Sequence, residues 1–174
     1  ISLTTSAGRL MDILGMPKED YSDAEHAEKF YEENRENGIS LCISKMSYTY
    51  HNGTKVFMRA DFEAHPHEIV ALVGPSGEGK TTLLRIMLAL LHIQSGDEDL
   101  VGAKTGEVLT ITPAARRLFS YVPQGNTMFS GTIAENMRNV RPDATDEEIK
   151  EVLIVSCAWE FVQKLPDGIY SKVG

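Results

Sequence analysis

The sequence GPSGEGKT at residues 74–81 constrains the fold more than any other stretch of this chain. It follows the apolar run EIVALV (68–73) and precedes the apolar run LLRIMLALL (83–91). Glycine admits the backbone angles and the close approach that turn N–H groups toward an anion. A helix that begins at about Lys80 directs its free N–H groups and its dipole at the same anion. Buried strand, glycine loop and helix together predict a phosphate-binding loop.

The side chains of this loop suit a nucleoside triphosphate with its magnesium ion. Lys80 supplies a positive charge on a flexible stem, the Thr81 hydroxyl is a ligand for Mg²⁺, and Thr82 reaches the α-phosphate side. The predicted nucleotide-binding residues of the loop are Gly74, Ser76, Gly77, Gly79, Lys80, Thr81 and Thr82. The alternative is a tight glycine turn with an incidental lysine, which the flanking apolar runs disfavour.

Composition limits the classes of function. With 174 residues, 42% of them hydrophobic, the chain is long enough for one globular domain. A net charge of −8 disfavours a protein that clamps nucleic acid, because such a protein needs a basic face. No apolar run reaches the ~18 residues of a membrane span, so we expect a soluble chain. Cys42 and Cys157 have no metal-ligand spacing, and we expect both to be reduced, in or near the core, in a cytosolic environment.

The first 37 residues are predicted to form two helices. The stretch SAGRLMDILGMP (6–17) places apolar residues on one helical face before Gly15 and Pro17 end the pattern. Residues 18–36 hold eight acidic and three basic side chains, with sparse apolar residues at helical spacing and Gly38 placed to end the helix. We interpret this segment as a solvated connector helix, and an acidic partner-binding arm is the alternative.

Strand signals begin at residue 39, and helix signals cluster late in the chain. Alternation over 39–50, the turn HNGT and a β-rich run at 56–63 predict two strands, while GEVLTI (106–111) and LFSYV (118–122) predict two more. Residues 82–91 are predicted to be a helix packed against a sheet. A capping box of Thr145 with Glu148 opens a helix to about residue 157, and a shorter one follows at 159–164. This order predicts an α/β core followed by a helical portion.

Three longer stretches resemble the nucleotide-binding domain of an exporter-type ATP-binding cassette (ABC) transporter. They are SYTYHNGTKVFMRADFEAHPHEIVALVGPSGEGKTTLLRIMLALL, RRLFSYVPQGNTMFSGTIAENM and ATDEEIKEVLIVSCAWEFVQKLPDGIYSKVG, and they agree with the family in order and spacing. The resemblance covers residues 39–174. The preceding SAGRLMDILGMPKED is similar to the linker that follows the last transmembrane helix of such proteins.

The resemblance implies an α/β fold and three divisions of the chain. The fold is a P-loop NTPase core of ABC type with an antiparallel β portion and the start of a helical subdomain, as an incomplete domain. The divisions are a linker at 1–37 after a transmembrane domain, an ATPase core with P-loop and Q-loop at 38–144, and the opening of the helical subdomain at 145–174, before the signature motif.

The resemblance also implies roles for residues outside the loop. Tyr50 matches the aromatic residue that stacks on adenine, with Tyr48 as the alternative stacker and a purely structural tyrosine also open. Gln124 in YVPQGN matches the glutamine that reaches Mg²⁺ and the attacking water. The predicted catalytic residues are therefore Lys80 and Gln124, and the predicted magnesium ligands are Thr81 and Gln124.

Further implied features concern the partners and the cofactors. The segment FSG (129–131) resembles the part that touches the coupling helix of the membrane domain, with buried packing as an alternative role for Phe129. ATP and Mg²⁺ are the implied cofactors. The implied partners are the transmembrane domain of the same transporter and a second nucleotide-binding domain, at the cytoplasmic face of the plasma membrane. The implied function of the full-length protein is ATP hydrolysis that drives export.

Several family residues fall beyond position 174, which limits what we expect of this chain. They are the signature motif, the second acidic motif, the catalytic glutamate and the switch histidine, so we expect nucleotide binding with little or no hydrolysis. Without the strand of the acidic motif, EIVALV is expected to have an unpaired edge and the chain to be marginally stable, to aggregate or to pair with a second copy. A non-catalytic nucleotide-binding or interaction fragment and another soluble P-loop NTPase are the alternatives. The acidic stretch SGDEDLVGAKTGE (95–107) is longer and more charged than the hairpin usual in the family.

Overall fold

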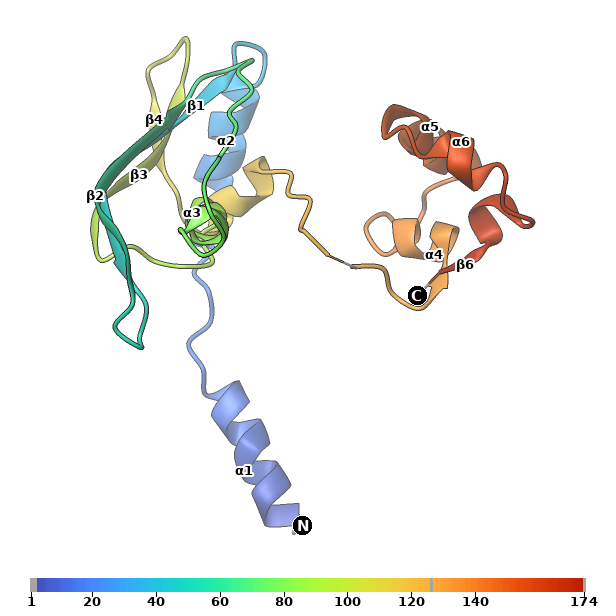
Figure 1. The fold of residues 1–174 in the computed structure, drawn as a ribbon, viewed down its shortest axis with the longest axis horizontal. Coiled ribbons are helices and arrows are strands. Elements are labelled where there is room, and N and C mark those ends of the chain that lie inside the picture. Colours follow the sequence, from blue (N-terminus) through green and yellow to red (C-terminus); the bar gives the residue numbers. More distant parts are fainter. Residues whose placement is uncertain (1–2, 126, 174) are drawn as a thin grey trace. The chain divides into compact units, whose positions relative to one another are not determined.

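The computed structural model describes residues 3–125 and 127–173 and divides the chain into two units (Figure 1). The first unit ends at Ser120 and holds α1 (Leu3–Leu14), α2 (Ala24–Asn34), β1 (Ile39–Thr49), β2 (Lys55–Ala64), α3 (Lys80–Met87), β3 (Ser95–Gly102), β4 (Val108–Thr110) and the 3-10 helix η1 (Pro113–Leu118). The second begins at Tyr121 and holds β5 (Gly131–Thr132), α4 (Ile133–Arg138), α5 (Asp146–Val155), α6 (Trp159–Val162), the 3-10 helix η2 (Gly168–Tyr170) and β6 (Lys172–Val173). Within the described ranges, every helix is too short or too polar to cross a membrane.

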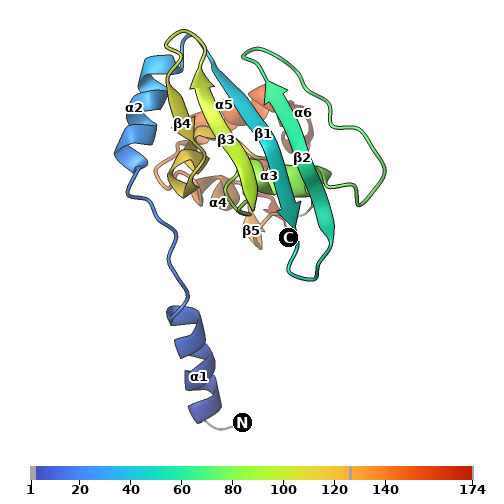
Figure 2. The ribbon, with the colours of Figure 1, turned by 90° about the vertical axis from the view of Figure 1, so that its left-hand side faces the viewer.

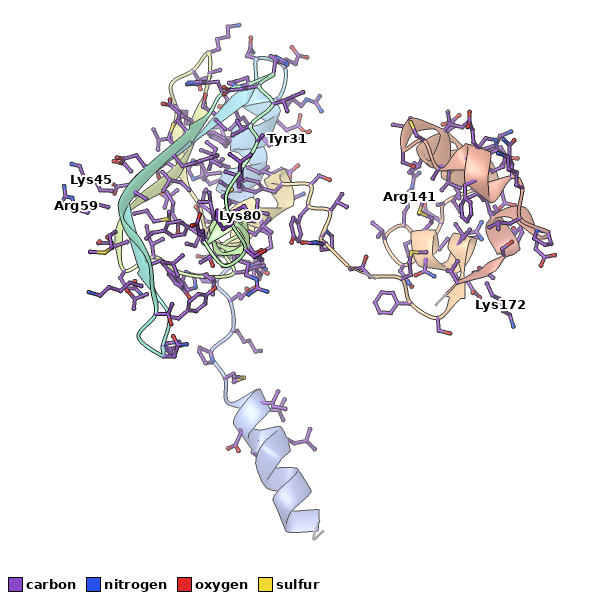
Figure 3. All side chains as sticks on the ribbon, viewed as in Figure 1. Tyr31, Lys45, Arg59, Lys80, Arg141 and Lys172 are labelled. Atoms are coloured by element: carbon purple, nitrogen blue, oxygen red, sulfur yellow. The ribbon has the colours of Figure 1, made fainter. Side chains whose placement is uncertain are left out.

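A four-stranded antiparallel sheet in the order β2-β1-β3-β4 frames the first unit (Figure 2). The turn HNGT joins β1 to β2, as predicted, and Leu41 of β1 pairs with Ala64 of β2 and Leu100 of β3. The β1–β2 register shifts near Lys45 and Arg59, which have φ angles of 50° and 55°. Both side chains project from the side of the sheet opposite α3 (Figure 3). Bulges of this kind add local twist to the strand pair.

Helix α3 packs its apolar face against this sheet. Leu83, Ile86 and Met87 of the helix form one hydrophobic cluster with Ile43 and Met46 of β1. Ile86 is completely buried and Met46 is 1% exposed. Burial of large apolar side chains is the main favourable term in folding, so this contact anchors the helix to the sheet. The predicted helix on a sheet is confirmed, although it ends at Met87.

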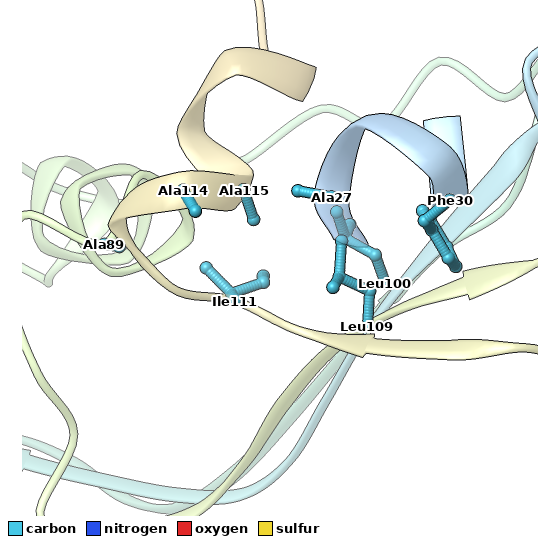
Figure 4. Packing of buried hydrophobic residues seen from close by; sticks show 8 residues of the cluster. All are labelled: Ala27, Phe30, Ala89, Leu100, Leu109, Ile111, Ala114 and Ala115. Atoms are coloured by element: carbon cyan, nitrogen blue, oxygen red, sulfur yellow. The ribbon is translucent and has the colours of Figure 1, made fainter. Parts of the chain in front are cut away.

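The predicted helix within residues 18–36 is confirmed as α2, but one of its faces belongs to the core, so the interpretation as a purely solvated connector is wrong. Ala27 and Phe30 are completely buried (Figure 4). Their cluster also contains Ala89, Leu100, Leu109, Ile111, Ala114 and Ala115. At the end of the helix, the buried Asn34 side chain donates to the carbonyl of Phe30 at 2.9 Å and accepts from the Thr105 hydroxyl at 2.8 Å. The acidic residues of α2 surround a narrow apolar face, and this face packs into the hydrophobic cluster.

Two of the predicted strands are not formed in the described structure, so these predictions are wrong. Residues 68–73 (EIVALV) and 118–122 (LFSYV) have no ladder partner among the described residues. Ile69, Val73 and Val122 are 98%, 88% and 89% exposed. Both runs are apolar enough for a buried parallel strand, but an extended segment becomes a strand only when its N–H and C=O groups pair with a neighbour.

The acidic stretch at 95–107 contains a strand that its composition conceals. Its first eight residues are β3, which pairs with β1 and β4, and the predicted strand GEVLTI is confirmed in part as β4. Glu98 points inward and is 8% exposed, and its Oε2 atom has no hydrogen-bond partner in the described structure. Burial, and then the charge of Asp99, raises the pKa of Glu98 to about 7.

The second unit is a helical cluster in which two helices begin with capping boxes. Thr132 and Glu135 form one at the start of α4. Thr145 and Glu148 form the other at the start of α5, as predicted. The core of the unit consists of Ile133, Ala134, Ile149, Leu153, Val162 and Ile169.

Three further side chains bear on the predictions. Phe129 is 69% exposed, so its alternative role in buried packing is wrong. Cys42 is partly buried and Cys157 is exposed, and both are free thiols. The predicted position in or near the core is therefore wrong for Cys157, which follows the end of α5 in a turn.

Replacing Glu98 with glutamine is expected to remove a pH-dependent loss of stability. The pKa of Glu98 is about 7 in the fold against an ordinary value of 4.5, so the folded chain holds an extra proton between these values. Stability contributed by this group therefore falls as the pH rises from about 4.5 to about 7 and stays low above that range. Glu98→Gln should melt at a higher temperature than the wild type at about pH 8 and at a similar temperature at about pH 4.

Thermal melts at both pH values check this prediction. The exposed neighbour Asp97 on the same strand provides the control variant Asp97→Asn, which should show no such difference between the two conditions. An advantage of Glu98→Gln that is equal at both pH values would contradict the assignment.

Candidate nucleotide-binding site

The glycine loop leads directly into helix α3, which begins at Lys80 as predicted. Gly77 and Gly79 have φ angles of 90° and 91°, which residues with a Cβ rarely adopt. A Cβ on Gly79 would lie 2.6 Å from Cγ1 of Val56 and 3.0 Å from Cζ of Phe57. Strand β2 therefore packs against the residue that precedes the helix and fixes where the loop ends.

Lys80 folds its side chain back over the loop. Its Nζ donates to the carbonyl oxygens of Gly74 and Pro75, both at 2.6 Å. The ammonium has three donors, and its charge adds to the partial positive charge of the N–H groups at the start of α3. Lys80 and these N–H groups are therefore the groups of the loop that can contact an anion, and Glu78 is the one acidic side chain in the same stretch.

The two threonines after Lys80 have different surroundings. Thr81 is exposed, and Thr82 is 6% exposed. The Thr82 Oγ1 atom lies 2.9 Å from the hydroxyl oxygen of Tyr50, within hydrogen-bond distance. The described structure therefore brings together two predicted site residues that are 32 positions apart.

The two candidate stacking tyrosines are in edge-to-face contact. The Tyr48 and Tyr50 ring centroids are 5.1 Å apart, with an angle of 84° between the planes. Tyr48 is 7% exposed and belongs to the core, whereas Tyr50 is only partly buried beside the P-loop helix. This difference in burial favours Tyr50 over Tyr48 as a residue that contacts a base.

Two further predicted residues, Ser76 and Gln124, have exposed side chains. Ser76 is exposed on the loop, and Gln124 is exposed in the second unit, so the joint action of Gln124 with the loop stays a prediction. Among the described residues no group of three or more His, Cys, Asp and Glu side chains is arranged to hold a metal. The exposed hydroxyl of Thr81 fits Mg²⁺, which prefers few protein ligands, several waters and phosphate oxygens.

Val56 and Phe57 are not among the predicted site residues, although their side chains shape the loop. Both limit the space at Gly79, although they precede it in the sequence by 23 and 22 positions. The only signal in the sequence is the apolar pair VF after the turn HNGT. Such a pair indicates a strand without indicating what the strand covers.

The glycine loop at the start of α3, the antiparallel sheet and the helical second unit agree with the resemblance found in the sequence. The family model described as "ABC transporter" matches residues 57–168. The chain belongs to the ABC transporter family. This match confirms the family that the sequence resemblance indicated.

Solved and curated relatives point to the exporter type. The structure of a bacterial Atm1-family ABC exporter with ATP bound matches with a TM-score of 0.68 and 26% identity, over 79% of this chain and 24% of that one. This match confirms the predicted fold class and its incompleteness relative to the exporter chain. An export ATP-binding/permease protein of Rickettsia conorii is 30% identical and covers 83% of this chain and 25% of its own length.

A second curated relative gives the same picture. The mitochondrial iron-sulfur clusters transporter ATM1 of Debaryomyces hansenii is 33% identical, over 76% of this chain and 19% of the relative. The chain thus spans a quarter or less of the length of these relatives.

Alanine at Gly79 should destabilise the chain more than alanine at Gly77. Both positions have the same φ, so both variants bear a backbone cost of about 1 to 2 kcal/mol. Only at Gly79 does the new Cβ clash with β2, because nothing lies within 4 Å of a Cβ at Gly77. Overpacking adds about 1 to 3 kcal/mol.

Denaturant unfolding of the two variants measures the difference. The double variant Gly79→Ala/Val56→Ala should recover part of the clash, since it removes the nearest side chain. Equal losses at Gly77 and Gly79 would contradict the packing of β2 on the loop.

Proposed function

We propose that this chain is the ATP-binding portion of an exporter, in which Mg-ATP bound at residues 74–82 drives the movement of a substrate across a membrane. The observation that carries the proposal is the glycine loop at the N-terminus of α3, in a chain of the ABC transporter family. The exporter names and the ATP-bound exporter structure among its relatives support the direction of transport.

The residues of this chain divide the work of holding the nucleotide. The N–H groups of the loop and of the first turn of α3 bind phosphate oxygens, and Lys80 adds a charge-assisted contact. Thr81 supplies a hydroxyl ligand to Mg²⁺, Thr82 reaches the α-phosphate side, and the ring of Tyr50 stacks on adenine. When bound, Mg²⁺ would supply neutralisation of the phosphate charge in transfer of the γ-phosphoryl group to water.

Hydrolysis and transport belong to the larger assembly. In that assembly Gln124 would orient the attacking water and would be a ligand for Mg²⁺. The assembly contains a transmembrane domain and a second nucleotide-binding domain, at the cytoplasmic face of the plasma membrane. This chain alone binds nucleotide with little or no turnover, and binding without turnover also describes the alternative of a non-catalytic fragment. The two hypotheses differ in their prediction for the longer protein, which hydrolyses ATP only if this chain is part of an exporter.

Lys80→Ala should weaken Mg-ATP binding by about 10- to 100-fold, because a charge-assisted contact contributes about 1.5 to 3 kcal/mol. Calorimetric titration of the purified chain measures the affinity. Lys104→Ala, which removes an exposed lysine from the turn between β3 and β4, is the control and should bind as the wild type does. Equal affinities of Lys80→Ala and wild type, with both chains folded, would contradict the assignment of the site.

Tyr50→Ala and Tyr50→Phe separate the ring from its hydroxyl. Loss of the ring should weaken ATP binding by about tenfold, since stacking on a base contributes about 1 to 3 kcal/mol. Tyr50→Phe keeps the ring and loses only the contact with Thr82, so its affinity should stay within about threefold of the wild type. Inorganic tripolyphosphate has no base, and its affinity should be the same for wild type and Tyr50→Ala. A tenfold loss with tripolyphosphate as well would rule out stacking as the role of Tyr50.

A further inference from the structure

Arg116 joins three segments of the first unit that are far apart in sequence. From η1, its Nε donates to the carbonyl of Leu88 at 2.7 Å and its Nη2 donates to the carbonyl of Ala89 at 3.0 Å. Nη1 and Nη2 also donate to the two carboxylate oxygens of Glu19, at 3.0 Å and 2.7 Å. One guanidinium therefore caps the C-terminal end of α3 and forms a bidentate ion pair with the segment before α2.

The end of α3 is a tight turn, and Arg116 donates to two carbonyl groups in it. The amide of Leu90 bonds to the carbonyl of Arg85 at 2.8 Å, and the amide of Ala89 bonds to that of Ile86 at 2.8 Å, which is the pattern of a Schellman cap. Ala89 has a φ of 49° at the position where glycine is usual, and this conformation costs about 1 to 2 kcal/mol. The two hydrogen bonds from Arg116 oppose this cost, and they depend on where its guanidinium is held.

Glu19 holds the guanidinium from the other side. The Tyr21 hydroxyl donates to Oε2 of Glu19 at 2.5 Å. The hydrogen bond from Arg116, followed by that from Tyr21, lowers the pKa of Glu19 to about 2, so its carboxylate is charged at neutral pH. The pair is partly exposed, with side-chain exposures of 28% for Arg116 and 45% for Glu19. Exposed pairs add little to global stability, so its effect is expected in local positioning.

Helix α3 is short, so we expect a shift of its C-terminal end to move its N-terminal end as well. It has eight residues, with the phosphate-binding loop at the first and the Arg116 cap after the last. At about 1.5 Å per residue the two ends are only about 12 Å apart. A two-turn helix packed on a sheet moves as one body, so a shift at the cap shifts the N–H groups of the loop.

We propose that the Glu19–Arg116 pair links residues 15–23, which join α1 to α2, to the position of the nucleotide-binding helix α3. Arg116 is then a positioning residue, and the link rests on the proposed function because α3 carries the nucleotide loop. A movement of residues 15–23 that opens the pair loosens the cap and weakens nucleotide binding. By reciprocity, bound nucleotide stabilises the closed pair.

A neighbouring ion pair provides a matched control. Arg117 follows Arg116 in η1 and pairs with Glu28 of α2, whose side chain is 45% exposed like that of Glu19. Within the described residues Arg117 makes no hydrogen bond to α3. Glu19→Gln and Glu28→Gln therefore remove equivalent charges, and only the first touches the cap.

The test is hydrogen exchange of the amides at the end of α3, combined with Mg-ATP titration of the 174-residue chain. In Glu19→Gln the amides of Leu88 and Leu90 should exchange about three- to tenfold faster and the Mg-ATP affinity should fall by a similar factor. Glu28→Gln should match the wild type in both. Unchanged exchange in Glu19→Gln, or the same change in Glu28→Gln, would overturn the proposal.

A double-variant cycle shows whether Glu19 acts through Arg116. Glu19→Gln added to Arg116→Gln should change neither exchange nor affinity further, whereas an independent, additive loss would overturn the link. If Arg116→Gln does not fold, Arg116→Lys replaces it, because lysine keeps the charge and loses the bidentate geometry. A wild-type chain that fails to bind Mg-ATP would refute the proposed function for this chain, and amide exchange at the cap would still decide the link.

Discussion

The packing of helix α3 against the bulged antiparallel sheet is the contact on which the first unit depends. Ile86 and its neighbours anchor the helix to β1, and β2 closes around Gly79 at its start. The phosphate-binding loop itself is largely exposed, and residues 68–73, which lie immediately before it, pair with no strand in the described structure. Its shape is therefore set from the helix side, by what fixes α3 at its two ends.

Local signals predicted local structure well. The turn HNGT, the helix start at Lys80 and the capping box of Thr145 with Glu148 all depend on residues within a few positions of one another. The strands predicted for EIVALV and LFSYV are absent from the described structure because a strand depends on residues far away in the sequence. Apolar composition indicates burial, but a parallel strand also requires a partner from a distant part of the chain. Strand β3 shows the converse, because pairing on both sides makes a strand of an acidic sequence.

In the candidate site, too, the residues set by local sequence were predicted and the long-range contacts were not. The glycines, Lys80 and the two threonines follow from spacing in one short stretch, and a family resemblance was needed to select Tyr50. The contact of Tyr50 with Thr82 and the packing of Val56 on Gly79 arise from tertiary structure, which sequence spacing does not encode. The partners of Arg116 are up to 97 residues away, so nothing near it in sequence distinguishes it from Arg117. Gln124 belongs to the other unit, and its role in the site remains a prediction.

The most direct test of the central claim is an NMR titration of the chain with Mg-ATP, followed through its assigned backbone amides. Binding at the loop predicts saturable shifts concentrated at residues 74–82, because phosphate oxygens replace water at those N–H groups, with a further change at Tyr50. Shifts confined to α4 and α5, or a folded chain whose loop amides do not respond, would contradict the account.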